Sequence, residues 1–217
     1  MMKIYTSIFI IITILLTACN TSFDYTKKVG YFKIDFPEKK YQLFDDPAFP
    51  YSFEYPVYAK IVKDSSTFFD SNPENVYWRN IDFTQFNAKI FLSYKQIGGR
   101  ALYKIKLANG AYKDSLGTNE YDKMISDAFR LTNKNEEKAL GKKDSSFKTS
   151  TNIAGMLFKL KGDVATQRQF FMTDTTKNFI RGALYFYASP NADSLQPVVN
   201  YLQQDIDHII NTFKWKR

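Results

Sequence analysis

The sequence predicts an α+β fold, a single domain in which a mainly antiparallel sheet is covered by two helices. Three observations support this prediction. Of the 217 residues, 17% are aromatic, and aromatic rings favour the pleated, half-buried surface of a strand. Apolar residues alternate with a period of two along much of the chain, whereas a helical period is found in only two stretches. Strands in a row, with helices that cover them, are typical of α+β proteins.

Short segments with a period of two dominate the first half of the chain. Phe32, Ile34 and Phe36 alternate with polar residues until Pro37 ends the pattern. Within the proline-rich stretch 38–56, only residues 51–55 favour a strand, and the prolines around them favour an edge position. Further strands are expected at 59–63, 78–83 and 88–94, the last with Ala88, Ile90, Leu92 and Tyr94 on one face.

The middle of the chain is less clear. Residues 98–117 allow more than one interpretation, because a strand at 103–107 lies between two turn signals, Gly98-Gly99 and Asn109-Gly110. After residue 119 the period becomes helical, and Tyr121, Met124, Ile125 and Ala128 predict a helix of about 14 residues. A polar loop is expected from the end of this helix to Thr151.

The second half of the chain predicts three strands and a long helix. The strands, at 153–161, 167–173 and 178–188, are joined by short turns and indicate a meander. The helix covers 194–213, with Asp193 or Ser194 as its cap and Pro197 in its first turn. Its apolar stripe consists of Leu195, Val199, Leu202, Ile206, Ile209 and Phe213. Together the elements make one domain over residues 29–217, and their order is similar to that of the PsbP/Mog1-type sandwich.

Residues 1–18 have the pattern of a bacterial lipoprotein signal peptide. Lys3 precedes an apolar stretch from Ile4 to Leu16, which is too short to span a bilayer as a helix. Residues 16–19, LTAC, resemble a lipobox, in which the cysteine thiol accepts diacylglycerol. Cys19 is the only cysteine in the sequence, so it is the predicted lipidation site. The polar residues 19–28 would form a lipidated tether, and the lipid bilayer would be the first partner.

The residues after Cys19 indicate in which membrane the protein is anchored. Asn20 stands where an Asp would favour retention at the inner membrane, and no acidic cluster of the kind linked to surface export follows. We therefore expect a lipid-anchored protein of the cell envelope, at the periplasmic face of the outer membrane. Two or three acyl chains would hold it there permanently, whereas one chain binds only marginally.

Charge argues against nucleic acid as a partner. The formal net charge is +8, but 24 of the 30 basic residues are Lys, which lacks the planar fork of Arg that suits phosphate and base recognition. The basic residues are also spread along the chain. A solvated, Lys-rich surface explains them, and contact with anionic lipid headgroups or acidic partners is the alternative.

Residues that could carry chemistry are scarce. His208 is the single histidine, and without a second His or a free Cys it is expected to be an ordinary residue of the helix surface rather than a metal ligand. No nucleophile elbow, phosphate loop or dinucleotide motif is present in the sequence. Asp35, Glu54 and Asp82 lie on predicted strands and are the best candidates for a hydrolase-type acid/base pair. We expect no enzyme activity, no cofactor and no metal.

Two further patterns concern modification and ligand binding. Ser115 and Ser194 lie in Asp-Ser-Leu triplets of the kind that Bacteroidetes O-glycosylate, and Ser115 is the stronger candidate because Ser194 also has a capping role. Aromatic residues gather in two predicted strands, where they would form a core on one side and a docking surface on the other, or a platform for sugars. They are Phe170, Phe171, Phe179, Tyr185, Phe186 and Tyr187.

Several longer segments resemble the gliding-motility lipoprotein GldD family of Bacteroidetes. They are residues 30–37 (GYFKIDFP), 78–83 (WRNIDF), 86–95 (FNAKIFLSYK), 183–191 (ALYFYASPN) and 212–216 (TFKWK). The segment 98–117 is longer than is usual in the family. The resemblance implies a non-enzymatic envelope component needed for gliding and for the linked type IX secretion system. It also implies other Gld lipoproteins (GldB, GldH, GldJ, GldK) or secretion components as partners, and acylation at Cys19. A lipoprotein that binds a glycan or a lipid is the alternative function.

Overall fold

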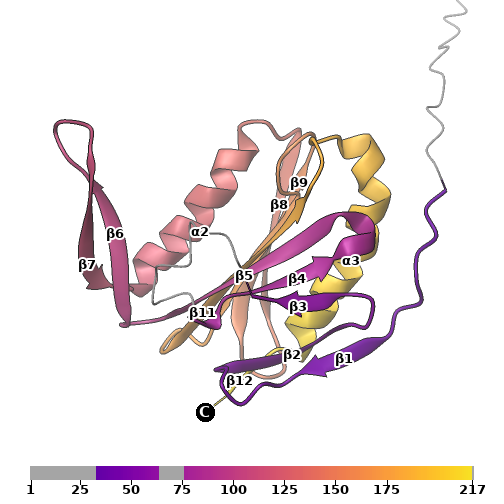
Figure 1. Ribbon diagram of the computed structural model, residues 1–217, viewed down its shortest axis with the longest axis horizontal. Helices are drawn as coiled ribbons and strands as arrows, with labels where there is room; N and C mark the ends of the chain where they lie inside the picture. Colours follow the sequence, from indigo (N-terminus) through magenta and orange to yellow (C-terminus); the bar gives the residue numbers. More distant parts are fainter. Residues whose placement is uncertain (1–32, 64–75, 217) are drawn as a thin grey trace, which may run out of the picture. The chain divides into compact units, whose positions relative to one another are not determined.

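A computed structural model describes residues 33–63 and 76–216 of the chain. The predicted signal peptide, Cys19 and the tether 19–28 lie outside the described residues, and so does the stretch 64–75. Residues 35–217 form one compact unit, which contains strands β1 to β12 and the helices α2 and α3 in the part that the structure describes (Figure 1). The predicted α+β class is confirmed.

A seven-stranded antiparallel sheet is the centre of this unit. Its order is β3-β4-β5-β11-β10-β9-β8, so β5 and β11 join strands from the two halves of the chain. The β5–β11 ladder is long, running from the pair Ala88–Phe186 to the pair Gln96–Asn178. The strands are β3 (Lys60–Val62), β4 (Arg79–Phe83), β5 (Ala88–Gln96), β11 (Asn178–Phe186), β10 (Arg168–Thr173), β9 (Ala154–Lys161) and β8 (Gly141–Lys148).

Helices lie on both faces of this sheet. On β5, the predicted set Ala88, Ile90, Leu92 and Tyr94 is buried in the larger core, together with apolar residues of helix α3 (Ala192–Thr212). The opposite face carries a smaller core, made by helix α2 (Tyr121–Glu136) with Phe158, Phe171 and Phe179. The alternation of the strand residues therefore separates a face covered by α3 from a face covered in part by α2.

Helix α3 confirms the prediction for the last helix, with a correction at its start. Val199, Leu202, Ile206, Ile209 and Phe213 are fully buried, and Leu195 is half-buried. The cap is Asn191, whose side chain accepts a hydrogen bond from the backbone N–H of Ser194 at 3.1 Å. The expected caps, Asp193 and Ser194, lie inside the first turn instead. Asn191 has the extended backbone of a cap residue, which sequence alone does not distinguish among neighbouring polar residues.

A second, three-stranded sheet has the order β1-β2-β12 and corrects two predictions. No strand is found at residues 33–36, and β1 (Tyr41–Phe44) begins later, in a stretch for which no strand was predicted. Strand β2 (Tyr51–Pro56) is central rather than an edge strand, because β12 (Lys214–Trp215) pairs with its second side. A two-residue partner from a distant part of the sequence leaves no periodic signal near β2.

The expected polar loop up to Thr151 is also wrong in part, because β8 lies within it. Strand β8 forms the edge of the large sheet and carries Lys142, Lys143 and Asp144 beside small polar residues. Charged residues are common on edge strands because they discourage pairing with other chains. The same residues conceal the strand from a search for apolar alternation.

The three strands that follow confirm the predicted meander, and the turn between β10 and β11 depends on Asp174. Its Oδ1 accepts hydrogen bonds from the backbone N–H groups of Thr176, Lys177 and Asn178, at 3.1, 2.8 and 2.8 Å. Burial opposes ionisation, but these hydrogen bonds outweigh it and hold the pKa of the Asp174 carboxyl below its usual value.

Replacing Asp174 with alanine is expected to lower the free energy of unfolding by about 1–2 kcal/mol at neutral pH, because three N–H groups lose their acceptor. The folded-state pKa is depressed, so this contribution is present above the unfolded pKa and disappears as the pH falls through the folded pKa. Urea unfolding at neutral pH and at roughly pH 2 checks this. A difference between the two proteins that is the same at both pH values would contradict the role of the carboxylate.

Between β5 and α2 the chain forms a separate two-stranded sheet of β6 (Arg100–Lys106) and β7 (Tyr112–Thr118), which we call the arm. The strand expected at 103–107 and the Asn109-Gly110 turn are confirmed, and β7 was not predicted. Backbone hydrogen bonds close the base of the arm, from Gly98 to Asn119 and from Asn119 to Gly99, both at 2.8 Å. Among the described residues, no helix has the length and apolar character needed to cross a membrane.

Candidate functional site

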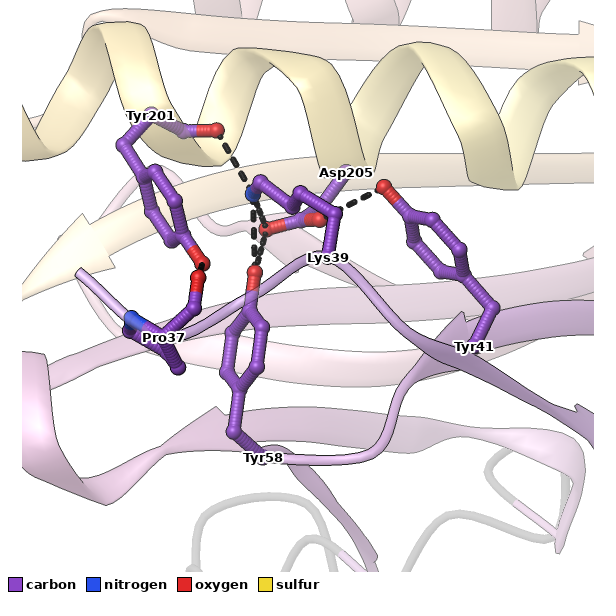
Figure 2. Close-up of polar contacts among 6 residues, drawn as sticks. All are labelled: Pro37, Lys39, Tyr41, Tyr58, Tyr201 and Asp205. Atoms are coloured by element: carbon purple, nitrogen blue, oxygen red, sulfur yellow. Dashed lines mark hydrogen bonds and ion pairs between the residues drawn. The ribbon is translucent and has the colours of Figure 1, made fainter.

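A buried polar cluster lies between helix α3 and the segment that leads into β1 (Figure 2). Asp205, on α3, is fully buried, and its carboxylate accepts three hydrogen bonds. The donors are Lys39 Nζ at 2.7 Å, the Tyr58 hydroxyl at 2.5 Å and the Tyr41 hydroxyl at 3.1 Å. Together with Tyr201, one helical turn before Asp205, these residues form what we call the Asp205 cluster.

Tyr201 fixes the same segment at further points. Its hydroxyl donates to the carbonyl of Pro37 at 2.6 Å, and its ring stacks on Phe36 with the ring centroids 4.4 Å apart. Lys39 Nζ lies 3.3 Å from the centroid of the Tyr201 ring and donates to the Tyr201 carbonyl at 3.0 Å. Side chains therefore hold residues 36–41 on α3, and the β1–β2 ladder begins only at Tyr41.

The Asp205 cluster combines one carboxylate with one ammonium group and two hydroxyl donors. Burial lowers the pKa of Lys39, while the hydrogen bond to Asp205 and its charge oppose this shift. Burial raises the pKa of Tyr58 and Tyr41, and the nearby carboxylate raises both further. Both hydroxyls therefore remain protonated at neutral pH and act as donors to Asp205. The arrangement can hold two parts of the chain together.

The Asp205 cluster was not predicted from the sequence, although one signal was available. Asp205 follows Leu202 by three residues and precedes Ile209 by four, so it falls on the buried side of the helix. A buried carboxylate needs a cation or several donors. Its partners, however, lie more than a hundred positions earlier in the sequence, where no local pattern connects them to α3.

His208 has specific partners, so its prediction as an ordinary surface residue was wrong. Its Nε2 lies 2.7 Å from an Oε of Glu54 on β2, and its ring stacks on Tyr41 with the centroids 3.5 Å apart. These contacts extend the Asp205 cluster toward the small sheet. They link α3, β1 and β2, and no metal ligand set results, because no group of three His, Cys, Asp or Glu residues in the described part of the chain could hold a metal ion.

The three carboxylates proposed as an acid/base pair have different surroundings. Glu54 contacts His208, as above, on the small sheet. Asp82 lies on β4 of the large sheet, where its carboxylate pairs with Lys89 at 3.2 Å and accepts a hydrogen bond from Thr84. Asp35 precedes the Asp205 cluster, in the segment without strand structure. The contacts of Glu54 and Asp82 connect each of them to other groups rather than to one another.

A groove lies on the other face of the large sheet, where helix α2 leaves part of β4, β5 and β11 uncovered. Its volume is about 690 Å³, within the range of small-molecule and peptide sites. The lining is mostly apolar and rich in aromatic rings. It includes Trp78, Phe91, Met124, Ala128, Leu131, Phe179, Ala183, Tyr185, Phe186 and Tyr187.

One basic residue of β11 adds polarity to this groove. Arg181 is half-buried in the lining, where its guanidinium donates to the side chain of Gln169, and burial lowers its pKa. Phe91 and Tyr185 lie nearby, with their rings edge to face and their centroids 5.5 Å apart. The groove therefore combines aromatic surface with two cations, Arg181 and Lys95, and the carboxylate of Asp127, which suits a contact of mixed apolar and polar character.

The aromatic residues singled out in the sequence are divided between core and groove. Phe170 is buried on the α3 side, Phe171 is buried under α2, and Phe179 lines the groove as well as the smaller core. Tyr185, Phe186 and Tyr187 line the groove, and Tyr187 is 63% exposed. Ser115 lies half-buried on β7 and Ser194 is exposed in the first turn of α3. Modification of either serine stays a prediction.

Fold and sites together define an α+β domain with a helix-covered antiparallel sheet, an open aromatic groove and a polar cluster that fixes the segment before β1. The chain belongs to the gliding motility lipoprotein GldD family, whose model matches residues 22–215. This confirms the resemblance seen in the sequence. Membership makes the protein a lipid-anchored component of the cell envelope with a role in gliding motility.

Two other comparisons complete this result. No match was found among curated proteins. Among solved structures, cyanobacterial PsbP (CyanoP) from Synechocystis sp. PCC 6803 is similar, with a TM-score of 0.44 and 11% sequence identity. That likeness covers 83% of this chain and 95% of the PsbP chain.

Proposed function

We propose that this lipoprotein is a non-enzymatic assembly or stabilising component of the gliding machinery and of the linked type IX secretion system. It acts through protein contacts, from the periplasmic face of the outer membrane, where acylated Cys19 anchors it. The observation that carries this proposal is the open aromatic groove between α2 and strands β4, β5 and β11. Large exposed apolar surfaces on soluble domains mark binding sites, and aromatic residues dominate the energy of protein contacts.

The Asp205 cluster supports the same function by limiting the distance between domain and anchor. Because residues 36–41 are fixed on α3, at most the residues from Cys19 to Asp35 separate the anchor from the domain. Sixteen residue steps of extended chain reach roughly 55 Å. The domain therefore stays within this distance of the bilayer and would meet partners that are anchored in the same membrane. Other Gld lipoproteins (GldB, GldH, GldJ, GldK) or secretion components are the proposed partners.

Site-specific crosslinking in outer membranes tests the groove. A photoreactive amino acid at Tyr187, on the rim of the groove, is expected to capture Gld lipoproteins or secretion components. Replacing both Phe91 and Tyr185 with alanine should lower the yield at least tenfold, because central aromatic contacts contribute about 2 kcal/mol or more each.

Two controls accompany this experiment. The photoreactive residue at Leu140, which is 90% exposed and does not line the groove, controls for chance encounters. The Cys19→Ala variant should lose the crosslinks if anchoring positions the contact. Equal capture from positions 187 and 140, or capture that survives the loss of Phe91 and Tyr185, would overturn the assignment of the groove.

A glycan or lipid ligand is the second candidate function, favoured by the combination of aromatic surface and the Arg181 guanidinium in one groove. A ligand that binds only the folded protein raises its melting temperature. Thermal unfolding with envelope glycans and with lipids distinguishes the two functions. A shift that the Phe91→Ala, Tyr185→Ala protein no longer shows would support the ligand, and no shift together with specific crosslinks would support the protein contact.

A further inference from the structure

The arm, residues 100–118, carries an unusual concentration of exposed apolar side chains. Five large apolar residues of the arm are between 39% and 76% exposed: Leu102, Ile105, Leu107, Tyr112 and Leu116. Leu102 and Leu116 lie directly opposite each other across the two strands, so they form one apolar surface. The two strands pair only with each other, and an isolated two-stranded hairpin is marginally stable in water. The arm therefore exposes an apolar surface that a contact outside the domain could cover, and such a contact would stabilise the hairpin.

The tip of the arm is apolar, and charged residues lie just behind it. The turn from Leu107 to Tyr112 contains Ala108, Asn109, Gly110 and Ala111. Two backbone hydrogen bonds close it: the N–H of Leu107 donates to the carbonyl of Ala111 at 2.7 Å, and the N–H of Gly110 donates to the carbonyl of Leu107 at 2.9 Å. Gly110 has a φ of +82°, a conformation that glycine adopts without strain. No residue of the turn is charged. The exposed Lys106 and Lys113 flank it on the two strands.

The arm has far more positive than negative charge. Its sequence contains four basic residues, Arg100, Lys104, Lys106 and Lys113, and a single acidic one, Asp114. An apolar tip with an aromatic residue and a basic surround is the arrangement expected for a bilayer interface: tyrosine favours the headgroup level, and lysines bind anionic headgroups. A protein partner without an acidic surface would explain the apolar residues but not the excess of positive charge around them.

We propose that the arm is a second membrane contact, which inserts its tip, Leu107 to Tyr112, into the interface of a bilayer that contains anionic lipids. This inference relies on the lipid anchor of the family and goes beyond the proposed function of the groove. The acyl chains hold the protein at the membrane, and the arm orients it. With two points of contact the groove has a defined direction relative to the bilayer, whereas a tether alone leaves the domain free to rotate.

The test uses the acylated full chain, reconstituted in vesicles of phosphatidylethanolamine and phosphatidylglycerol. Because Cys19 is the only native cysteine and is acylated in this protein, Ala108→Cys introduces a unique thiol for a polarity-sensitive fluorophore. Insertion predicts blue-shifted emission and quenching by lipids with brominated acyl chains. A label at Gln204→Cys, on the exposed side of α3, should show neither effect.

Matched variants separate the apolar and the electrostatic parts of the contact. Leu107→Ser with Tyr112→Ser should abolish the blue shift, and Leu140→Ser, at an exposed leucine outside the arm, should leave it unchanged. Replacing Lys106 or Lys113 with glutamine should lower the ratio of inserted to free arm roughly fivefold per lysine. The effect should be weaker in phosphatidylcholine vesicles and at high salt.

Three results would overturn the proposal. The first is a label at position 108 that reports water in both kinds of vesicle while the protein remains bound through its acyl chains. The second is quenching at position 204 equal to that at position 108. The third is protection of position 108 only when other envelope proteins are added, which would assign the arm to a protein partner. None of these results bears on crosslinks from the groove, so the two proposals fail independently.

Discussion

Replacement of Asp205 by alanine is expected to lower the free energy of unfolding by about 3 kcal/mol, a large part of the stability of a single domain. The substitution removes the carboxylate that pairs with Lys39 Nζ at 2.7 Å and leaves the Tyr41 and Tyr58 hydroxyls without their acceptor. The Lys39 side chain is 21% exposed, so it regains some hydration, which keeps the cost near the lower end for buried ion pairs. Urea denaturation of the two proteins gives the difference directly.

A control on the same helix makes this result specific. Asp207, two residues further on, is half-buried and accepts one hydrogen bond from Gln203 within the helix, so Asp207→Ala should cost only about 0.5 kcal/mol. Loss of the Asp205 cluster should also free residues 36–41, which limited proteolysis detects as new cleavage before β1. An Asp205→Ala protein that is as stable as the Asp207→Ala protein would contradict the role assigned to the cluster.

Replacement of Gly182 by alanine is expected to destabilise the protein by a comparable amount, about 3 kcal/mol. Gly182 lies in β11, opposite Phe170 of β10, and a Cβ built on it would be 2.2 Å from Cζ of the Phe170 ring. Phe170 is only 1% exposed, so its ring has no free space into which it could move. The ring lies against the backbone at a position where only glycine leaves room for it.

A second substitution tests this explanation. If the loss arises from overlap with the ring, Phe170→Leu should restore part of the stability in the Gly182→Ala background, although the same change alone destabilises the protein by opening a cavity. Melting temperatures of the four proteins of this double-mutant cycle measure the coupling. Additive effects of the two substitutions would show that the ring is not the cause.

Elements with their own periodic pattern could be predicted from the sequence, and elements that depend on distant partners could not. The alternation of Ala88, Ile90, Leu92 and Tyr94 identified β5, because burial of one face produces a periodic apolar pattern within the strand's own sequence. The apolar stripe of α3 identified that helix for the same reason. Strands β1, β7, β8 and β12 were missed because they are short or polar. Pairing with a neighbour stabilises such strands more than their own composition does.

The candidate sites show the same division. The aromatic residues of β11 were recognised as core and surface, but the groove exists only because α2 leaves β4, β5 and β11 partly uncovered, and the sequence does not give that offset. His208 and Asp205 are ordinary residues by pattern. Their partners, among them Lys39, Tyr41 and Glu54, come from a segment that the fold alone brings to α3. Acylation at Cys19 stays a prediction, supported by membership of a lipoprotein family.

The late position of α3 in the sequence has a consequence for export. A chain that is exported from its N-terminal end, as the predicted signal peptide requires, delivers residues 36–58 first and residues 199–215 last. Until α3 arrives, Lys39, Tyr41 and Tyr58 lack their acceptor, β2 lacks β12, and the larger core lacks one wall. Native structure depends on contacts between these distant segments, so it cannot form early. The topology therefore delays the native packing of residues 36–58 until translocation is nearly complete.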